Sequence, residues 1–562
     1  LPVLMNHHAL VFPSIFSVLG AKKVTKPVVS AVLDIVENLL NHEDSLKSVH
    51  LAQDKVKFQA IASTKAGVSI TRIVNDKMLA SEPEQDKVTK SGEAADEMDS
   101  SSDEDPVQES DDEQQIQKDY LSSMSNAEKA TLTKKIQNIW KRYISCFLAN
   151  IHTYLAYVFD PSSDKLKLLT STQVTNLNRK APNGITEKMI PEYLLFPKRE
   201  LDLLARVSKY ANDSETASQL VELMLPCLKS VSSLKRNNSP VKRQARTSIL
   251  TIIRDMIPLL KEPEKCIPSL SKQFYFLDSL KDRVLLAEIF VSLGKRLTDY
   301  AEVSSVLSNL NQMEPGRINE IDYEKRMSAY RLVNKRYLST WNHQQLTPVA
   351  YHFLYDLRQD ELGLRSSASN ALNMLITQCK QSNEPVDPRI LEGSDEDEDG
   401  SDKEEETDQG RKRKRSSGDS ESEALQKQNK PHRVVRLVSD IIYPSIKQGL
   451  KHHDTTVRRE ICRVLSHLAR TYKENYSHMN CLIHENLDLD FFENINHIQS
   501  HRRVKAMTRI QKKCADGEVS ATCVTHILLP LCNHFVYEPE VETSLREEAL
   551  RTIGELSNVL NW

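Results

Sequence analysis

Apolar residues recur every three or four positions along most of this chain, which is the spacing of one face of an α-helix. The first half of Leu437–Tyr472 predicts a helix whose apolar face consists of Leu437, Ile441, Ile442, Ile446 and Leu450. The second half predicts another, with an apolar face of Val457, Ile461, Val464, Leu465 and Leu468. Pro444 should kink the first helix, and the polar residues 452–454 should form the turn between the two.

This helix pair recurs along the chain. The pattern is a proline, then a basic residue and then an apolar stripe at helical spacing. It begins at Pro13, Pro226, Pro348 and Pro530. Arg458 and Arg546 are 88 residues apart, or two units of 44, and Arg502 lies at the midpoint with its apolar register off by about one residue. A period of about 40–47 residues is typical of HEAT and armadillo repeats. We therefore predict an all-α fold, a HEAT/armadillo-type α-solenoid in which stacked helix pairs bury a continuous core.

Two segments interrupt this pattern with acidic residues. Glu82–Glu113 holds 14 acidic residues and 2 lysines, and Glu392–Arg415 holds 11 acidic and 6 basic residues. Both lack the apolar residues that a packed structure needs, so we predict disordered acidic insertions at 82–118 and 392–431. HEAT-type repeats are predicted at 1–81, 119–391 and 432–562, with 160–197 rich in loops because of its prolines.

Without the two acidic segments the chain has a net charge of +14, although its total is −3. A basic body indicates an anionic partner, most commonly a nucleic acid. The alternative is that its acidic insertions simply balance the charge.

The insertions carry short candidate sites. Five serines have an acidic residue three positions on, which suits an acid-directed kinase: Ser100, Ser101, Ser102, Ser394 and Ser401. A basic run is a candidate nuclear-import signal: Arg411, Lys412, Arg413, Lys414 and Arg415. The alternative for this run is an intramolecular pairing with the acids before it.

Composition and motifs exclude several classes of fold and activity. Only 14 glycines occur in 562 residues, which disfavours folds built on glycine turns. No phosphate-binding loop, dinucleotide fingerprint, metalloprotease or nucleophile-elbow motif is present, so we predict no enzyme activity, cofactor or small-molecule substrate. No apolar run reaches the roughly 18 residues of a membrane span, so no membrane partner is expected.

Nine cysteines without a C-x-x-C pair indicate a reducing compartment rather than a disulfide framework. A zinc site could be assembled from Cys523, His526, Cys532 and His534, but structural zinc sites usually have tighter spacing. Because Cys514, Cys523 and Cys532 lie in an apolar helical pattern, we favour buried thiols without a metal.

The segment Asp490–Lys513 is the most distinctive. Phe491, Phe492, Ile495 and Ile498 predict an apolar stripe on a first helix. A second helix then carries basic residues on one face, which could follow a phosphate backbone. These candidates for contact with RNA or a partner are Arg502, Arg503, Lys505, Arg509, Lys512 and Lys513. The alternative is an ordinary solvated helix face, and no interleaved aromatics suggest base stacking.

Asp490–Met507 (DFFENINHIQSHRRVKAM) resembles the family of the U3 small nucleolar RNA-associated protein 20, also called down-regulated in metastasis. Phe196–Asp213 (FPKRELDLLARVSKYAND) and Tyr443–Tyr472 are similar to the same family. The resemblance covers the whole chain and is strongest from about Leu437 onward. Family members are several times longer. Because the chain begins at Leu1 rather than Met and ends beside a helical pattern, we expect an internal fragment.

The resemblance implies a very large, non-catalytic α-solenoid of the small-subunit processome in the nucleolus. It implies a role in early processing of the small-subunit pre-rRNA, with pre-rRNA or the U3 small nucleolar RNA and other processome proteins as partners. The alternative that the residues leave open is a HEAT adaptor for nuclear transport or regulation, which would bind proteins only.

Overall fold

The computed structural model describes residues 8–21, 27–41, 43–44, 125–160, 197–232, 240–317, 320–381, 436–539 and 541–560. The chain divides into two compact units, Leu1–Leu223 and Met224–Trp562. The described residues are almost entirely helical. Their single β-type interaction is an isolated antiparallel bridge between Met313 and Ile321, so the predicted all-α fold is confirmed.

The first unit is built around the long helix α6 (Asn126–Phe159). A capping box, in which Ser125 and Glu128 exchange hydrogen bonds with each other's backbone, fixes its start. Helix α2 (His8–Leu19) packs against α6, where Phe16 meets the edge of Phe147 with 5.1 Å between ring centroids. The other elements are residues 27–41, α9 (Lys198–Val207), η3 (Ser208–Tyr210) and the start of α10 (Ser214–Ser232).

Charged residues join the helix at 27–41 to α9 in this unit. Arg199 of α9 bonds to Asp34 at 2.5 Å and to Glu37 at 2.6 Å. Seven residues further along each segment, which is about two helix turns, the pairing is repeated by Arg206 and Asp44 at 2.7 Å. These exposed pairs set the register of two helices that are far apart in sequence.

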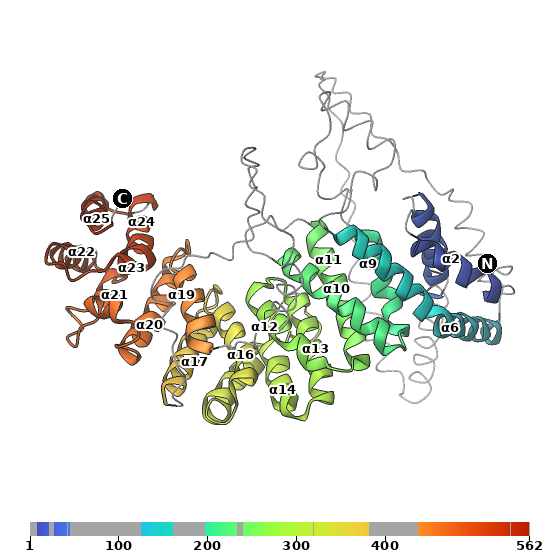
Figure 1. Cartoon of the computed structure of the whole chain (residues 1–562). Coiled ribbons are helices and arrows are strands. Elements are labelled where there is room, and N and C mark those ends of the chain that lie inside the picture. Colours follow the sequence, from blue (N-terminus) through green and yellow to red (C-terminus); the bar gives the residue numbers. More distant parts are fainter. Residues whose placement is uncertain are drawn as a thin grey trace, which may run out of the picture. The chain divides into compact units, whose positions relative to one another are not determined.

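The second unit stacks its helices in chain order (Figure 1). Its elements are α11 (Pro240–Met256), η4 (Ile257–Leu259), η5 (Pro263–Cys266), α12 (Ile267–Phe276), α13 (Leu280–Arg296), η6 (Thr298–Tyr300), α14 (Ala301–Leu310), α15 (Tyr323–Leu332), η7 (Val333–Tyr337), α16 (His343–Asp356), α17 (Leu362–Gln381), η9 (Leu437–Ile442), α19 (Tyr443–Gly449), α20 (Thr455–Thr471), η10 (Ser477–Leu482), α21 (Phe491–Ile495), α22 (Ser500–Ala515), α23 (Ala521–Cys523), η11 (Val524–Leu528), α24 (Leu529–Tyr537) and α25 (Thr543–Ser557).

Most contacts between these helices join elements that are close in chain order. Helix α11 packs on α13, α15 on α17, α17 on α20 and α22 on α25. One extensive contact reaches further along the chain, where α12 packs on α16. Because α17 lies directly against α20, the array continues across the long segment between them. This nearest-neighbour packing is the solenoid arrangement predicted from the apolar period.

Most residues of the predicted apolar faces are buried. All ten apolar positions predicted for the helix pair of Leu437–Tyr472 are buried. Ile498, predicted to continue the stripe of α21, is 77% exposed because that helix already ends at Ile495. Leu550 of α25 is also exposed.

The expected kink at Pro444 takes a specific form. A π-helical turn, η9, leads directly into α19, and Pro444 lies at the start of α19. The same order recurs where η11 leads into α24 at Pro530. Proline cannot donate the usual helix hydrogen bond and crowds the carbonyl four residues earlier, and the wider π-turn relieves both constraints.

From the pair α12–α13 onward, an arginine at the fourth position of the second helix marks the repeat. It donates to backbone carbonyls that lie at the end of the preceding helix or just beyond it: Arg283, Arg326, Arg365, Arg458, Arg503 and Arg546. Carbonyls at a helix end have no partner within the helix, so the guanidinium fixes the turn between the paired helices. Arg503, rather than the predicted Arg502, therefore occupies the repeat position.

Helices α13–α16 also share a buried polar cluster. Arg283 donates from Nε to Asn311 Oδ1 at 3.1 Å, and His352 Nε2 lies 3.2 Å from the same oxygen. Tyr330 donates to Asp356 Oδ2 at 2.7 Å. The sequence patterns gave no sign of this cluster, because its members are scattered over four helices.

Several predictions lie outside the described residues. The acidic insertions, the candidate serines Ser100, Ser101, Ser102, Ser394 and Ser401, and the basic run Arg411–Arg415 belong to them, as does nearly all of the loop-rich 160–197. The predicted repeat boundaries likewise stay predictions.

Candidate nucleic-acid interface on helix α22

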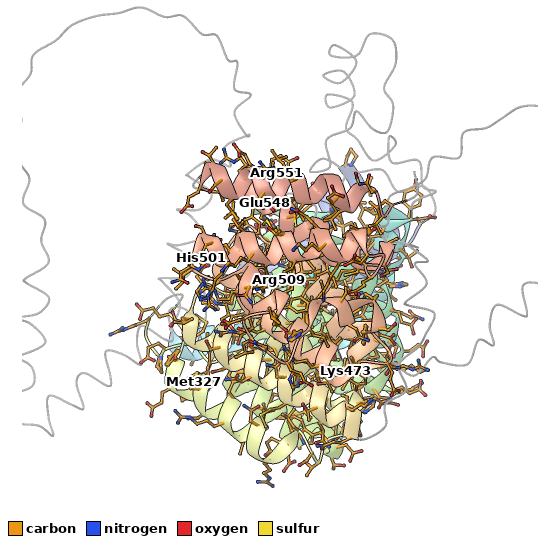
Figure 2. All side chains as sticks on the ribbon, turned by 90° about the vertical axis from the view of Figure 1, so that its left-hand side faces the viewer. Met327, Lys473, His501, Arg509, Glu548 and Arg551 are labelled. Carbon is orange, nitrogen blue, oxygen red and sulfur yellow. The ribbon has the colours of Figure 1, made fainter. Side chains whose placement is uncertain are left out.

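Helix α22 is positioned by the short helix before it and the last described helix after it. Asp490 caps α21 by accepting from the backbone N–H of Glu493 at 3.1 Å, and the apolar residues Phe491, Phe492 and Ile495 are buried. Helix α22 then buries Ala506, Met507 and Ile510 and packs against α25. In Figure 2 the two helices lie side by side, with the side chains of α22 reaching outward.

The six predicted basic residues do not form one uniform stripe. Arg503 turns inward as the repeat arginine, donating to His497 O at 2.6 Å and Ile498 O at 3.0 Å. Arg509 donates to Asp488 O at 2.5 Å, and Lys513 donates to Cys481 O at 2.5 Å. These three side chains hold the preceding segment 481–498 against α22, a structural role that spacing along the helix could not reveal.

The remaining three face solvent more freely. Arg502 forms an exposed ion pair with Asp488 at 3.2 Å, an arrangement that contributes little to stability. Lys505 and Lys512 are exposed, and no ion pair or hydrogen bond within the described residues engages their side chains. Lys505, Lys512 and Arg502 are therefore the part of the predicted set available to a phosphate backbone; we call them the α22 lysine face.

Positive charge is concentrated at the start of α22. The pKa of His497 is lowered, first by desolvation and then by the nearby side chains of Arg502, His501, Arg503 and Arg459. The first turn has no acidic residue, and the helix has no side-chain cap. Since the helix dipole adds partial positive charge at this end, the surface around His501, where nitrogen atoms gather in Figure 2, attracts anions.

The alternative zinc site is not assembled. His534 Nε2 lies 3.0 Å from Leu450 O, while the Cys523 sulfur faces Cys481. Among the described residues, no group of three or more His, Cys, Asp or Glu side chains is arranged to hold a metal ion. Cys523 and Cys532 are buried as predicted, whereas Cys514 is partly exposed. No described helix is long and apolar enough to span a membrane.

A buried histidine near this surface makes stability depend on pH. Burial, with a smaller effect of His526, lowers the pKa of His478 to about 4, and its Nε2 lies 3.2 Å from the hydroxyl of Tyr443. Below pH 6.5 the unfolded chain binds a proton on this ring and the folded chain does not. His478 should therefore contribute fully to stability above pH 6.5 and progressively less as the pH falls toward 4.

We expect His478→Gln, which cannot titrate, to lose less stability than the unaltered chain between pH 6.5 and 4.5. Urea unfolding at several pH values, followed by circular dichroism, measures the two slopes. Equal slopes would show that His478 is protonated in the folded chain.

Comparison with known proteins finds one family profile and two relatives that carry the same description. The family profile described as "U3 small nucleolar RNA-associated protein 20, N-terminal" matches residues 1–392. The chain is 22% identical over 369 residues to the U3 small nucleolar RNA-associated protein 20 of Saccharomyces cerevisiae and 24% identical over 370 residues to that of Schizosaccharomyces pombe. Each match covers 64% of this chain and 13% of the relative. The profile includes Phe196–Asp213 and ends before α22.

Proposed function

This chain belongs to the family of the U3 small nucleolar RNA-associated protein 20, and on that premise we propose that it is a non-catalytic helical scaffold in ribosome biogenesis. It acts in the nucleolus, within the small-subunit processome, and supports early processing of the small-subunit pre-rRNA together with the U3 small nucleolar RNA. The name shared by both relatives, which ties them to that RNA, supports this assignment. The matched region spans 13% of either relative, so the partners of the whole protein are part of the proposal.

The α22 lysine face is the proposed RNA contact of this region. Exposed Lys505 and Lys512 lie on one side of α22, and Arg502 continues that side toward the cationic start of the helix. Ammonium groups spaced along a helix can pair with successive phosphates without reading bases. Contact of this kind recognises the charge and shape of an RNA helix rather than its sequence.

A protein-only HEAT adaptor is the second candidate. The exposed apolar residues Leu487, Leu489 and Ile498 in the segment beside α22 favour it, since such residues at a surface suit a protein partner. In that case the lysine face would bind an acidic protein surface.

Crosslinking in cells, followed by sequencing of the RNA bound to the tagged full-length protein, separates the two candidates. Reads concentrated on pre-ribosomal RNA and the U3 small nucleolar RNA are expected from the scaffold. RNA at background level, together with recovery of protein partners, would replace it with the adaptor.

The lysine face itself is tested by charge reversal. We expect Lys505→Glu with Lys512→Glu to weaken binding of the 562-residue chain to duplex RNA about tenfold at physiological salt. The slope of log affinity against log salt concentration should fall by about 2, one for each lost phosphate contact. Fluorescence anisotropy with labelled RNA measures both quantities.

The matched control is Lys473→Glu, an exposed lysine that follows α20 (Figure 2). It changes net charge by half as much and leaves α22 untouched, so its affinity should stay within about twofold of the unaltered chain. A loss scaling with net charge alone in both variants would remove the α22 lysine face as the contact.

A further inference from the structure

Two thiols from different repeats meet beside α22. Cys481 lies in η10 and Cys523 in α23, 42 residues later, and their sulfur atoms are 4.0 Å apart. Cys481 is partly exposed, whereas Cys523 is buried. One thiol of the pair is thus open to a small reagent, and the other is sheltered directly behind it.

The surroundings make Cys481 the more acidic thiol. The hydrogen bond between the Cys481 and Cys523 sulfur atoms and the nearby ammonium of Lys513 lower the pKa of Cys481. The same hydrogen bond, together with burial, raises the pKa of Cys523. Because the thiolate is the nucleophilic form of cysteine, Cys481 is the thiol that reacts first and Cys523 the one that reacts second.

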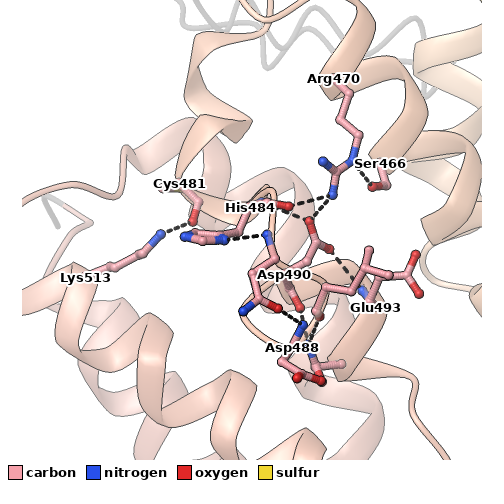
Figure 3. A network of polar contacts seen from close by, with 11 residues as sticks. Ser466, Arg470, Cys481, His484, Asp488, Asp490, Glu493 and Lys513 are labelled. Atoms are coloured by element: carbon pink, nitrogen blue, oxygen red, sulfur yellow. Dashed lines mark hydrogen bonds and ion pairs between the residues drawn. The ribbon is translucent and has the colours of Figure 1, made fainter.

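Polar contacts hold the Cys481 segment in place (Figure 3). Lys513 donates to the backbone oxygen of Cys481, at 2.5 Å. Just beyond, the buried carboxylate of Asp490 accepts from the backbone N–H of His484 at 3.0 Å and is paired with Arg470. Arg470 also donates to the carbonyl of His484 at 3.1 Å. The segment that carries Cys481 is therefore anchored from both α20 and α22.

We propose that Cys481 and Cys523 form an oxidation site that takes hydroperoxides and ends in a disulfide. The Cys481 thiolate attacks the terminal oxygen of the hydroperoxide, so that an S–O bond forms and the O–O bond breaks. The attacked oxygen stays on sulfur as a sulfenic acid, and the other oxygen leaves as hydroxide or alkoxide, which takes a proton from water. Sulfur is oxidised by two electrons and the peroxide is reduced. Cys523 then attacks the sulfenic sulfur, an S–S bond forms, the S–O bond breaks, and the Cys523 proton joins the departing hydroxide as water.

The crosslink would enclose the candidate interface. A disulfide needs the sulfur atoms to approach to about 2.0 Å, which is about 2 Å closer than in the reduced pair. The closed loop would contain α21 and α22 with Arg502, Lys505 and Lys512. A disulfide lowers the conformational entropy of the unfolded loop and so stabilises the folded segment. Oxidation should therefore protect this segment from proteolysis.

The test treats the reduced 562-residue chain with a small excess of hydrogen peroxide, blocks free thiols with an alkylating reagent and maps peptides without reduction. We expect a crosslinked pair of peptides containing Cys481 and Cys523, and slower cleavage by trypsin between residues 483 and 522. Oxidation of Cys481 to the sulfinic acid without a crosslink, or first oxidation of another cysteine, would overturn the proposal. Both measurements on the unaltered chain are independent of whether any variant folds.

Two variants test which cysteine reacts first and which one closes the disulfide. Cys523→Ser should leave a sulfenic acid on Cys481 that dimedone traps, because the second thiol is missing. Cys514→Ser is the matched control, since Cys514 is partly exposed and close enough to influence both thiols, and it should retain the crosslink in full. A crosslink that disappears with Cys514→Ser would assign the disulfide to Cys514 instead.

Discussion

Asp356→Ala is expected to lower the free energy of unfolding of the Met224–Trp562 unit by about 3–5 kcal/mol. Asp356 is fully buried at the end of α16, where burial raises its pKa and the guanidinium groups of Arg283 and Arg326 oppose that rise. Both arginines are themselves buried. Removing the carboxylate leaves the buried Arg283 without its nearby acid and leaves Arg326 with Asp322 alone. It also leaves the Tyr330 hydroxyl without its acceptor.

The neighbouring groups cannot replace the lost charge. Burial and the two arginines lower the pKa of His352 well below its usual value, so its ring is neutral. Asn311 already accepts from Arg283. Because the cluster joins Arg283 of α13, Asn311 at the end of α14, Tyr330 of α15 and Asp356 of α16, the loss should loosen the packing of all four helices.

Asp360→Ala is the matched control, because Asp360 is an exposed aspartate in the following turn and its replacement should change stability by no more than about 0.5 kcal/mol. Urea unfolding combined with hydrogen exchange of peptides from α13–α16 assigns the loss to this region. Equal stability of the two variants would contradict the proposed role of the buried cluster.

Arg458→Leu is expected to cost about 3 kcal/mol in the same unit. The Arg458 side chain is 2% exposed and donates from Nη1 to the carbonyls of His452 and His453, each at 2.7 Å, and from Nη2 to Glu538. Leucine fills much of the space but leaves two carbonyls and a carboxylate without their donor. A fully buried group left unsatisfied costs about 1–3 kcal/mol, and these three are partly buried, so each costs about 1 kcal/mol.

Arg459→Leu removes the same charge one residue further along α20, where the side chain is only partly buried, and should cost about 0.5 kcal/mol or less. Urea unfolding measures both variants, and faster amide exchange in α19 and α20 should accompany only Arg458→Leu. If the two variants unfold at the same urea concentration, the repeat arginine does not fix the turn.

The helices and their buried faces could be predicted from the sequence because they depend on local spacing. Val457 and Ile461 recur at helical spacing, and each lies on the buried face of α20. A solenoid packs each helix mainly on its neighbours, so the period of the pattern also indicated the architecture. The family was evident in short motifs such as Phe196–Asp213, within the residues that its profile matches.

The exact register and the use of each polar side chain depended on the tertiary structure. Arg502 and Arg503 are adjacent and chemically identical, yet one faces solvent and the other caps the preceding turn, because a helix turns by 100° per residue. From the sequence, all six basic residues formed one candidate face. In the structure, three of them donate to the carbonyls of Cys481, Asp488 and His497, and the other three are left to face solvent.

Long-range pairs were outside the reach of sequence patterns. Cys481 and Cys523 are 42 residues apart, and Tyr330 and Asp356 are 26 residues apart. A repeat period shows which helices are neighbours, but it does not show which polar side chains of those helices meet. The sequence by itself determined which segments are helical and which faces are apolar, because both follow from local periodicity. Only the packing of helix on helix decided which thiols meet, which charges are buried together and which lysines stay free for a partner.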